Sequence, residues 1–126
     1  MTVTPHADLA GDEPVVAPGA DGPRLVGARC GGCGTAWFPY RAVCPSCAAP
    51  GPGRLLLGPA GTLYSWSTVH ISSSRPVPYT LGYVDMAEGV RVLATIKPAR
   101  PLILNGSCRL VASPAGWWFE PEGDAA

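Results

Sequence analysis

The sequence has no run of about 18 apolar residues, so we expect no helix that crosses a membrane. Charged residues make up only 14% of the chain, and nine basic side chains balance nine acidic ones. Proteins that bind nucleic acids usually carry a basic surplus, so this balance argues against that class. The start of the chain also lacks the basic segment and apolar stretch of a secretory signal peptide, and we expect a cytoplasmic protein.

Helical periodicity is missing as well. No long segment repeats apolar residues at helical spacing, and 15 prolines and 16 glycines disfavour long helices. Because 47% of the residues are hydrophobic, the chain can still bury a core. We therefore expect a folded, mainly β protein.

Groups for acid–base or nucleophilic catalysis are scarce. Of the two histidines, His6 lies in a loose start of the chain and is expected to be solvated, and His70 lies in a predicted strand over residues 62–71. No nucleophile or orienting carboxylate stands at a supporting spacing from His70. Cys108 lies beside Leu110 in another predicted strand and is expected to be a buried small hydrophobic residue. We expect no catalytic residue in this chain.

Four cysteines are the most informative residues present. They form two Cys-x-x-Cys pairs, Cys30/Cys33 and Cys44/Cys47, with ten residues between the pairs. Glycine and proline within the pairs let the backbone curl so that both sulfurs of a pair reach one ion. Zn²⁺ prefers four such ligands in a tetrahedron, and four cysteines leave no open position for chemistry. We expect one structural Zn²⁺ per chain.

Disulfides, a redox dithiol and an iron site are the alternatives to zinc. Disulfides need an oxidising compartment, which the start of the chain does not indicate. A thioredoxin-like dithiol would stand alone beside a βαβ pattern. An iron-based electron carrier of the rubredoxin type stays open, although the ten-residue spacing suits a zinc ribbon better.

Composition divides the chain into four expected segments. They are a flexible, proline- and glycine-rich arm at residues 1–24, a ribbon at 25–53, a barrel at 54–121 and a tail at 122–126. In the barrel segment, we expect short strands at 55–57, 62–71, 79–86, 90–96, 108–112 and 117–119, with turns at Glu88-Gly89 and Asn105-Gly106. Many short strands with no covering helix favour a closed barrel, because closure removes exposed edges.

The order of these motifs resembles a known family. The matching stretches are residues 29–34, 38–41, 44–47, 61–66, 78–79, 88–92, 105–106 and 119–121. They are similar to zinc-ribbon proteins with an OB-fold that are associated with acyl-CoA metabolism and accompany thiolase-like enzymes. The resemblance implies a rubredoxin-like zinc ribbon followed by a small five-stranded OB-fold barrel.

The resemblance also implies a function. It identifies the chain as a non-catalytic accessory subunit of a thiolase-like acyl-CoA enzyme, which is an acyltransferase, a thiolase or an aldolase. The subunit would support assembly and acyl-CoA binding while its thiolase-like or ketosynthase-like partner makes or breaks a carbon–carbon bond. Candidate acyl-CoA or partner contacts are Arg41, Arg75, Tyr79, Trp117 and Trp118.

The alternative function is a single-stranded nucleic-acid-binding OB-fold module with a structural zinc ribbon. Tyr64, Trp66 and Tyr79 could stack bases in such a module. The sequence offers no basic groove to follow a phosphate backbone, which argues against this alternative.

Overall fold

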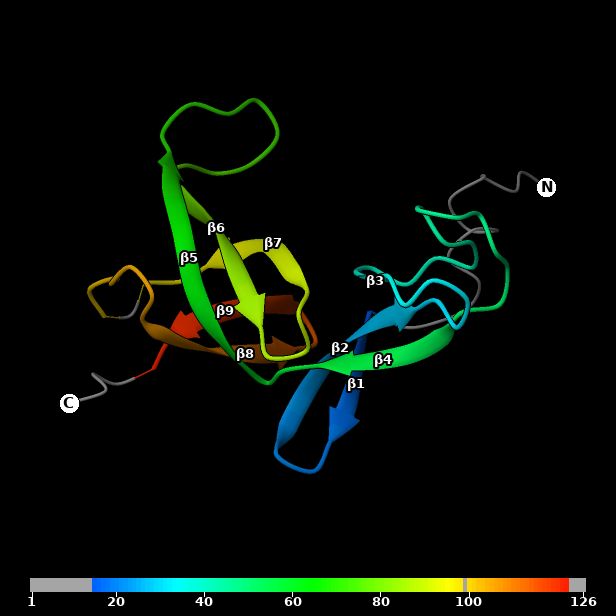
Figure 1. Cartoon of the computed structure of the whole chain (residues 1–126). Coiled ribbons are helices and arrows are strands. Elements are labelled where there is room, and N and C mark those ends of the chain that lie inside the picture. Colours follow the sequence, from blue (N-terminus) through cyan, green and yellow to red (C-terminus); the bar gives the residue numbers. More distant parts are fainter. Residues whose placement is uncertain (1–14, 99, 123–126) are drawn as a thin grey trace. The chain divides into compact units, whose positions relative to one another are not determined.

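The computed structural model describes residues 15–98 and 100–122. These residues form nine strands and no helix, which confirms the prediction of a mainly β protein (Figure 1). In the same part of the chain, no helix has the length and hydropathy needed to span a membrane. The chain divides into two compact units, Met1–Leu57 and Gly58–Ala126, which are described separately below.

The first unit is a four-stranded antiparallel sheet built around its second strand. Its strands are β1 (Val16–Gly19), β2 (Gly22–Arg29), β3 (Ala36–Trp37) and β4 (Gly53–Leu57). β2 pairs with β1, β3 and β4, and its residues Leu25, Val26 and Ala28 are completely buried. Gly27 is also fixed by packing, because a Cβ atom there would lie 2.5 Å from the carbonyl oxygen of Trp37.

Two boundaries of this unit differ from the sequence-based expectation. β1 and the start of β2 lie inside the predicted flexible arm, because Gly22, with φ of 129°, allows a tight turn that pairs the two strands. Residues 1–14 of that arm lie outside the described residues. The strand predicted at 55–57 belongs to β4 and not to the barrel, because completely buried Leu57 pairs opposite Leu25 of β2.

The second unit is the predicted five-stranded barrel. Its strands are β5 (Ala60–Val69), β6 (Tyr79–Met86), β7 (Arg91–Ile96), β8 (Ser107–Ser113) and β9 (Gly116–Pro121). They close in the order β5-β6-β7-β9-β8 (Figure 1). Neighbours pair antiparallel except β7 and β9, whose parallel bridge joins Ile96 to Phe119 and completes the closure.

Side chains from alternate positions of the strands fill the barrel. Every second residue of β6 and β7 is buried, including Val84, Val92 and Ile96, and Leu110 of β8 and Phe119 of β9 join them in the core. This alternation is expected of strands with one face in a core. A glycine at position 82 is required among them, because a Cβ atom there would lie 2.8 Å from the Ser65 carbonyl oxygen and 2.9 Å from Ile96.

The predicted turns are confirmed, and one predicted strand is shifted. Gly89 and Asn105 have φ of +89° and 63°, as tight turns of their kind require. The strand predicted at 62–71 is β5, which ends at Val69, so His70 lies beyond the strand and is exposed. A bulge between Leu63 and Ser65 also interrupts the regular alternation of side chains along β5.

Candidate functional site

The two cysteine pairs lie in two knuckles of the same backbone form. The amide of Gly34 donates to the carbonyl of Cys30 at 3.0 Å, and the amide of Ala48 donates to the carbonyl of Cys44 at 2.9 Å. Gly34 and Ala48 both have positive φ, at 80° and 64°. The chain therefore builds the same tight turn twice, four residues after the first cysteine of each pair.

Backbone amides donate to the buried sulfur of each knuckle. The donors to Cys30 are Gly32 and Cys33 at 3.4 and 3.5 Å, and the donors to Cys44 are Ser46 and Cys47 at 3.3 and 3.5 Å. At Cys30 the amides of Cys33 and Gly32 lower the pKa of the thiol, because they favour its charged form. A metal ligand must be a thiolate, so these hydrogen bonds favour the metal-binding form of Cys30.

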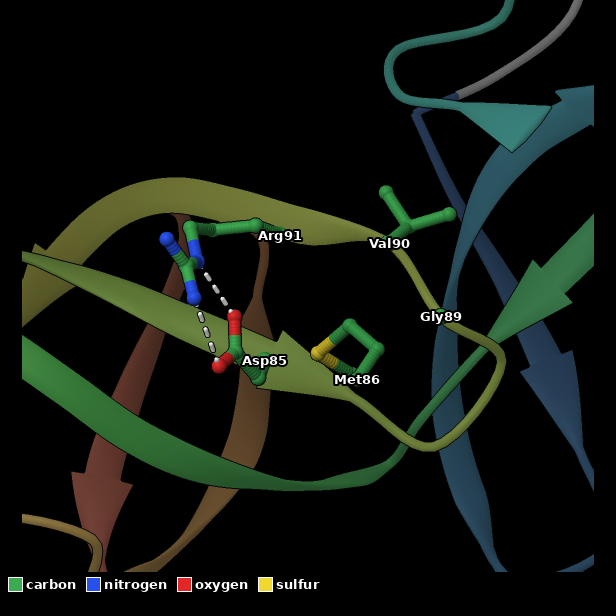
Figure 2. A pocket seen from close by; sticks show the side chains of 5 residues that line it. All are labelled: Asp85, Met86, Gly89, Val90 and Arg91. Carbon is green, nitrogen blue, oxygen red and sulfur yellow. Dashed lines mark hydrogen bonds and ion pairs between the residues drawn. The ribbon is translucent and has the colours of Figure 1, made fainter. Parts of the chain in front are cut away.

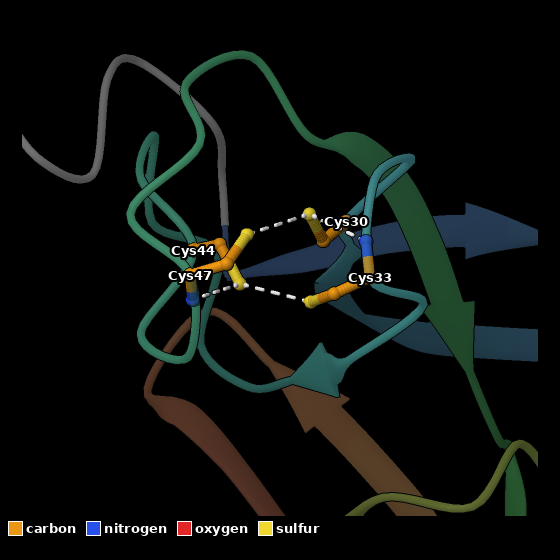
Figure 3. A group of neighbouring side chains, drawn as sticks. All are labelled: Cys30, Cys33, Cys44 and Cys47. Atoms are coloured by element: carbon orange, nitrogen blue, oxygen red, sulfur yellow. Dashed lines mark hydrogen bonds between the residues drawn. The ribbon is translucent and has the colours of Figure 1, made fainter.

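The four cysteine sulfurs lie close enough together to bind one metal ion. All four Sγ atoms lie within 4.8 Å of one another, and the Cys30–Cys47 and Cys33–Cys44 sulfurs are each 3.6 Å apart (Figure 3). A tetrahedral site with Zn–S bonds of about 2.3 Å places sulfurs about 3.8 Å apart, whereas a disulfide needs about 2.05 Å. The spacing fits zinc, and all five cysteines are free of disulfides.

The two exposed cysteines of this centre differ in acidity. A hydrogen bond with Thr35, whose Oγ1 lies 3.1 Å from Cys33 Sγ, lowers the pKa of Cys33 to about 6. A backbone hydrogen bond with Ala49 lowers the pKa of Cys47, but the three neighbouring thiols outweigh it and raise that pKa to about 11. A bound Zn²⁺ would hold all four as thiolates and leave no open ligand position, so the ion is structural.

Replacing Gly34 with alanine is expected to weaken zinc binding about fivefold. The left-handed backbone at Gly34 costs an L-residue roughly 1 kcal/mol, and that cost falls on the folded knuckle. Gly31→Ala is the matched control, because both glycines have open space around them and Gly31 has no positive φ. Competition with a chromophoric zinc chelator measures both affinities. Equal affinities for the two variants would contradict the role of this turn.

In the barrel unit, the structure brings two of the predicted contact residues together. The guanidinium of Arg75 lies 3.8 Å from the centroid of the Tyr79 ring and donates to Thr95 Oγ1 at 3.5 Å. Both line a groove of about 420 Å³ that also includes Lys97. Lys97 Nζ in turn lies 3.7 Å from the centroid of the Trp118 ring. This groove combines cations with aromatic rings.

The other predicted contact residues are placed differently. Trp118 donates its indole N–H to Glu120 at 2.9 Å, and Trp117 packs edge-to-face on buried Phe119 with ring centroids 6.4 Å apart. Arg41 belongs to the first compact unit and donates to the carbonyl of Tyr40 at 3.0 Å. The structure thus places Arg75 and Tyr79 in one groove. Trp118 lies next to this groove, because its ring contacts Lys97.

One site was missed by sequence reasoning. Arg91 forms a two-point ion pair with Asp85, at 2.6 Å from Nε to Oδ1 and 3.1 Å from Nη2 to Oδ2, and its guanidinium lies 3.6 Å from the Tyr64 ring centroid. The pair lines a hollow of about 460 Å³ beside Met86, Gly89 and Val90 (Figure 2). The Arg91 hydrogen bond lowers the pKa of Asp85, so this carboxylate stays charged and is a poor proton carrier. The signal was available, because the turn at Gly89 sets the two residues opposite each other.

Cys108 is expected to be the last thiol to react with an alkylating reagent. It is 1% exposed, and burial together with the charge of Glu122 raises its pKa to about 12, so almost no thiolate exists at pH 8. After zinc removal by a chelator, mass spectrometry should find the four ribbon cysteines modified and Cys108 intact until denaturant is added. Modification of Cys108 at the rate of the ribbon thiols would contradict its burial.

Two family models match the chain. Residues 19–53 match the rubredoxin-like zinc ribbon domain of ChsH2, and residues 56–107 match the C-terminal OB-fold domain of ChsH2. The zinc centre described above lies in the first match, and most of the barrel lies in the second.

Curated relatives cover much of the same stretch. A DUF35 domain-containing scaffold protein of Methanocaldococcus jannaschii is 32% identical over 81 residues, which are 61% of this chain and 57% of that protein. The benzoylsuccinyl-CoA thiolase subunit BbsA of Thauera aromatica is 39% identical over 97 residues, which are 75% of this chain and 63% of that protein. The chain spans about three fifths of the length of the curated relatives it matches.

Solved structures agree with these matches. The Ltp2-ChsH2(DUF35) aldolase superposes with a TM-score of 0.60 at 25% identity, over 78% of this chain and 84% of that one. A DUF35-family protein of unknown function from Sulfolobus solfataricus has a TM-score of 0.59 at 11% identity, over 79% and 76%, and shows the fold alone. With one zinc ribbon and one OB-fold barrel matched in order, this chain belongs to the ChsH2-type family of zinc-ribbon and OB-fold proteins.

Proposed function

We propose that the chain is a non-catalytic accessory subunit of a thiolase-like acyl-CoA enzyme. The observation that carries this proposal is the 39% identity, over 75% of the chain, to a protein named as a thiolase subunit. Two further relatives are named scaffold proteins, and a similar solved structure is named as part of an aldolase. The partner in this proposal catalyses formation or cleavage of a carbon–carbon bond next to a thioester.

The chemistry of the described residues supports a role in which the partner, and not this chain, carries out catalysis. The zinc centre has four cysteine ligands and no open position. Asp85 is neutralised by Arg91, and Cys108 is buried as a thiol. His70 is exposed, and no carboxylate or nucleophile in the described part of the chain forms a hydrogen bond with it. These features support an accessory role in which the partner supplies the acid, base or nucleophile.

The groove of about 420 Å³ that Tyr79 and Lys97 line supports a role in substrate binding. Lys97 carries a positive charge there, and a cation suits the phosphates of an acyl-CoA. Arg41, Arg75, Trp117 and Trp118 stay proposed as further acyl-CoA or partner contacts. The barrel would then present part of the acyl-CoA to the partner.

Coelution tests the assembly. The zinc-loaded full chain is mixed with a thiolase-like or aldolase-like subunit from the same organism and separated by size-exclusion chromatography with light scattering. We expect a single complex with a mass that equals a whole-number combination of the two subunits. Separate elution of the chain from every thiolase-like and aldolase-like protein of that organism would contradict the proposal.

A further inference from the structure

The outer face of the barrel over β6 and β7 carries a cluster of neighbouring apolar side chains. Tyr83 and Leu93 lie directly opposite each other on β6 and β7, and their side chains are 44% and 53% exposed. Leu81 lies on the same face, two positions from Tyr83. Single exposed apolar residues are ordinary, but adjacent ones on one sheet face indicate a binding surface.

This face is hollowed and not flat. A hollow of about 340 Å³ is lined by residues of three strands: Ser65, Trp66, Ser67 and Val69 of β5, Leu81, Gly82 and Tyr83 of β6, and Leu93 of β7. In the register of the sheet, Ser65 pairs with Tyr83 and Ser67 pairs with Leu81. Small serine side chains beside large apolar ones leave a depression with room for more than one apolar side chain of a partner. We call the depression lined by these eight residues the β5–β7 hollow.

Positive charge borders the β5–β7 hollow. Arg75 donates a hydrogen bond to Thr95, a residue of β7 that lies opposite Leu81 of β6. No carboxylate within the described residues pairs with Arg75. Asp85 is the acidic residue among the outward positions of β6 and β7, and Arg91 neutralises it. The surface therefore offers an apolar depression with an unneutralised cation at its edge.

We propose that the β5–β7 hollow is the docking site for the thiolase-like subunit. Apolar side chains of that subunit enter the hollow, and a neighbouring carboxylate of the same subunit pairs with Arg75. This inference depends on the proposed function and adds to it the surface that makes the contact. Interfaces commonly gain most of their affinity from a few such residues near their centre.

The charges favour this occupant over the others. In a symmetric pair of this chain, the same surface faces itself, so a second copy would bring another Arg75 and no free carboxylate. A nucleic acid needs a row of cations along its backbone, whereas the cation among the outward positions of β6 and β7 is Arg91, which Asp85 neutralises, and Arg75 and Lys97 at one end do not make a row. An apolar projection next to an acid matches both features of the face.

Two variants of opposite kind test the docking site. Ser67→Phe fills the hollow and removes no contact, and Leu93→Lys places a charge in it. Each is expected to weaken binding of the zinc-loaded chain to the purified thiolase-like subunit by at least about 30-fold, as loss of an interface anchor does. Leu104→Lys is the matched control, because Leu104 is 60% exposed and lies in the loop between β7 and β8. It is expected to change affinity less than about threefold.

A third variant tests the charge at the edge. Arg75→Glu is expected to slow association about tenfold at low salt and to lose this effect at high salt, because a peripheral charge mainly steers encounter. Biolayer interferometry measures the rates, and thermal unfolding checks that each variant is folded. Unchanged rates for Arg75→Glu at low salt would overturn the proposed pairing with a carboxylate.

The remaining outcomes distinguish this inference from the function on which it depends. If the wild-type chain binds the subunit and both Ser67→Phe and Leu93→Lys bind equally well, the hollow is not the docking site and the accessory function stands. If the wild-type chain binds no thiolase-like or aldolase-like subunit, both proposals fail. A dimer of the chain alone that Leu93→Lys dissociates, or tight salt-sensitive oligonucleotide binding that it abolishes, would assign the face to another occupant and overturn the inference.

Discussion

Replacing Cys44 with serine is expected to release the zinc ion and unfold the first compact unit. Cys44 is 2% exposed, its sulfur accepts two backbone amides, and it lies 3.6 Å from the Cys33 sulfur. A serine hydroxyl stays protonated and is a poor zinc ligand. Structural zinc contributes roughly 10 kcal/mol in small zinc-finger peptides, which is as much as the whole stability of a typical domain. A small sheet that loses this contribution does not stay folded.

The barrel is expected to survive this change. Its five strands pair with one another and close without a strand from the first unit. Metal analysis should find about one zinc per wild-type chain and almost none in Cys44→Ser, and NMR should retain the barrel resonances alone. Ser46→Ala is the matched control in the same knuckle, because its backbone amide and not its hydroxyl donates to Cys44. Well-folded wild-type protein with far less than one zinc per chain would contradict this account.

Replacing Phe119 with alanine is expected to destabilise the barrel by about 4 kcal/mol, as truncation of a buried phenylalanine usually does. Phe119 is completely buried, pairs with Leu110 across β8 and makes the bridge to Ile96 that closes the barrel. The alanine variant leaves a cavity at the place where β7 and β9 meet. A loss of this size is a large fraction of the stability of a small domain, so the unfolding midpoint of the barrel should fall far below that of the wild type.

Guanidinium titration followed by tryptophan fluorescence measures this loss. Trp118→Ala is the control from the same strand, because Trp118 points outward and is only half-buried. It is expected to cost about 1 kcal/mol, the typical effect of a point substitution. Zinc content should not change in either variant. A smaller loss for Phe119→Ala than for Trp118→Ala would contradict the assignment of Phe119 as the residue that closes the barrel.

The zinc centre and the barrel were predictable because their signals are local. Each Cys-x-x-Cys pair needs only a few residues to form its knuckle. In β7, Val92, Ala94 and Ile96 occupy every second position of the sequence, and these are the positions buried in the barrel. Glycines at tight turns are read from neighbouring residues in the same way.

Strand pairing was harder to predict because it joins distant residues. Nothing in the sequence around Leu57 says whether it pairs in the ribbon or in the barrel, and the choice depends on Leu25, more than thirty residues earlier. The bulge before Ser65 similarly reassigns the residues after it to the opposite face of β5. For this reason the β5–β7 hollow and the contact of Arg75 with Tyr79 emerge only from the structure.

The central claim is that this chain assists a thiolase-like enzyme without supplying catalytic groups. Steady-state kinetics of acyl-CoA turnover tests this claim most directly. The measurement compares the partner alone, the zinc-loaded chain alone, and the complex formed with wild-type, His70→Ala or Cys108→Ala chain. We expect no turnover by the chain alone, a changed rate or KM of the partner in the complex, and kcat values of both variant complexes within about threefold of wild type. A fall of about a thousandfold in kcat for His70→Ala or Cys108→Ala, with the complex intact, would show that this chain carries catalytic groups.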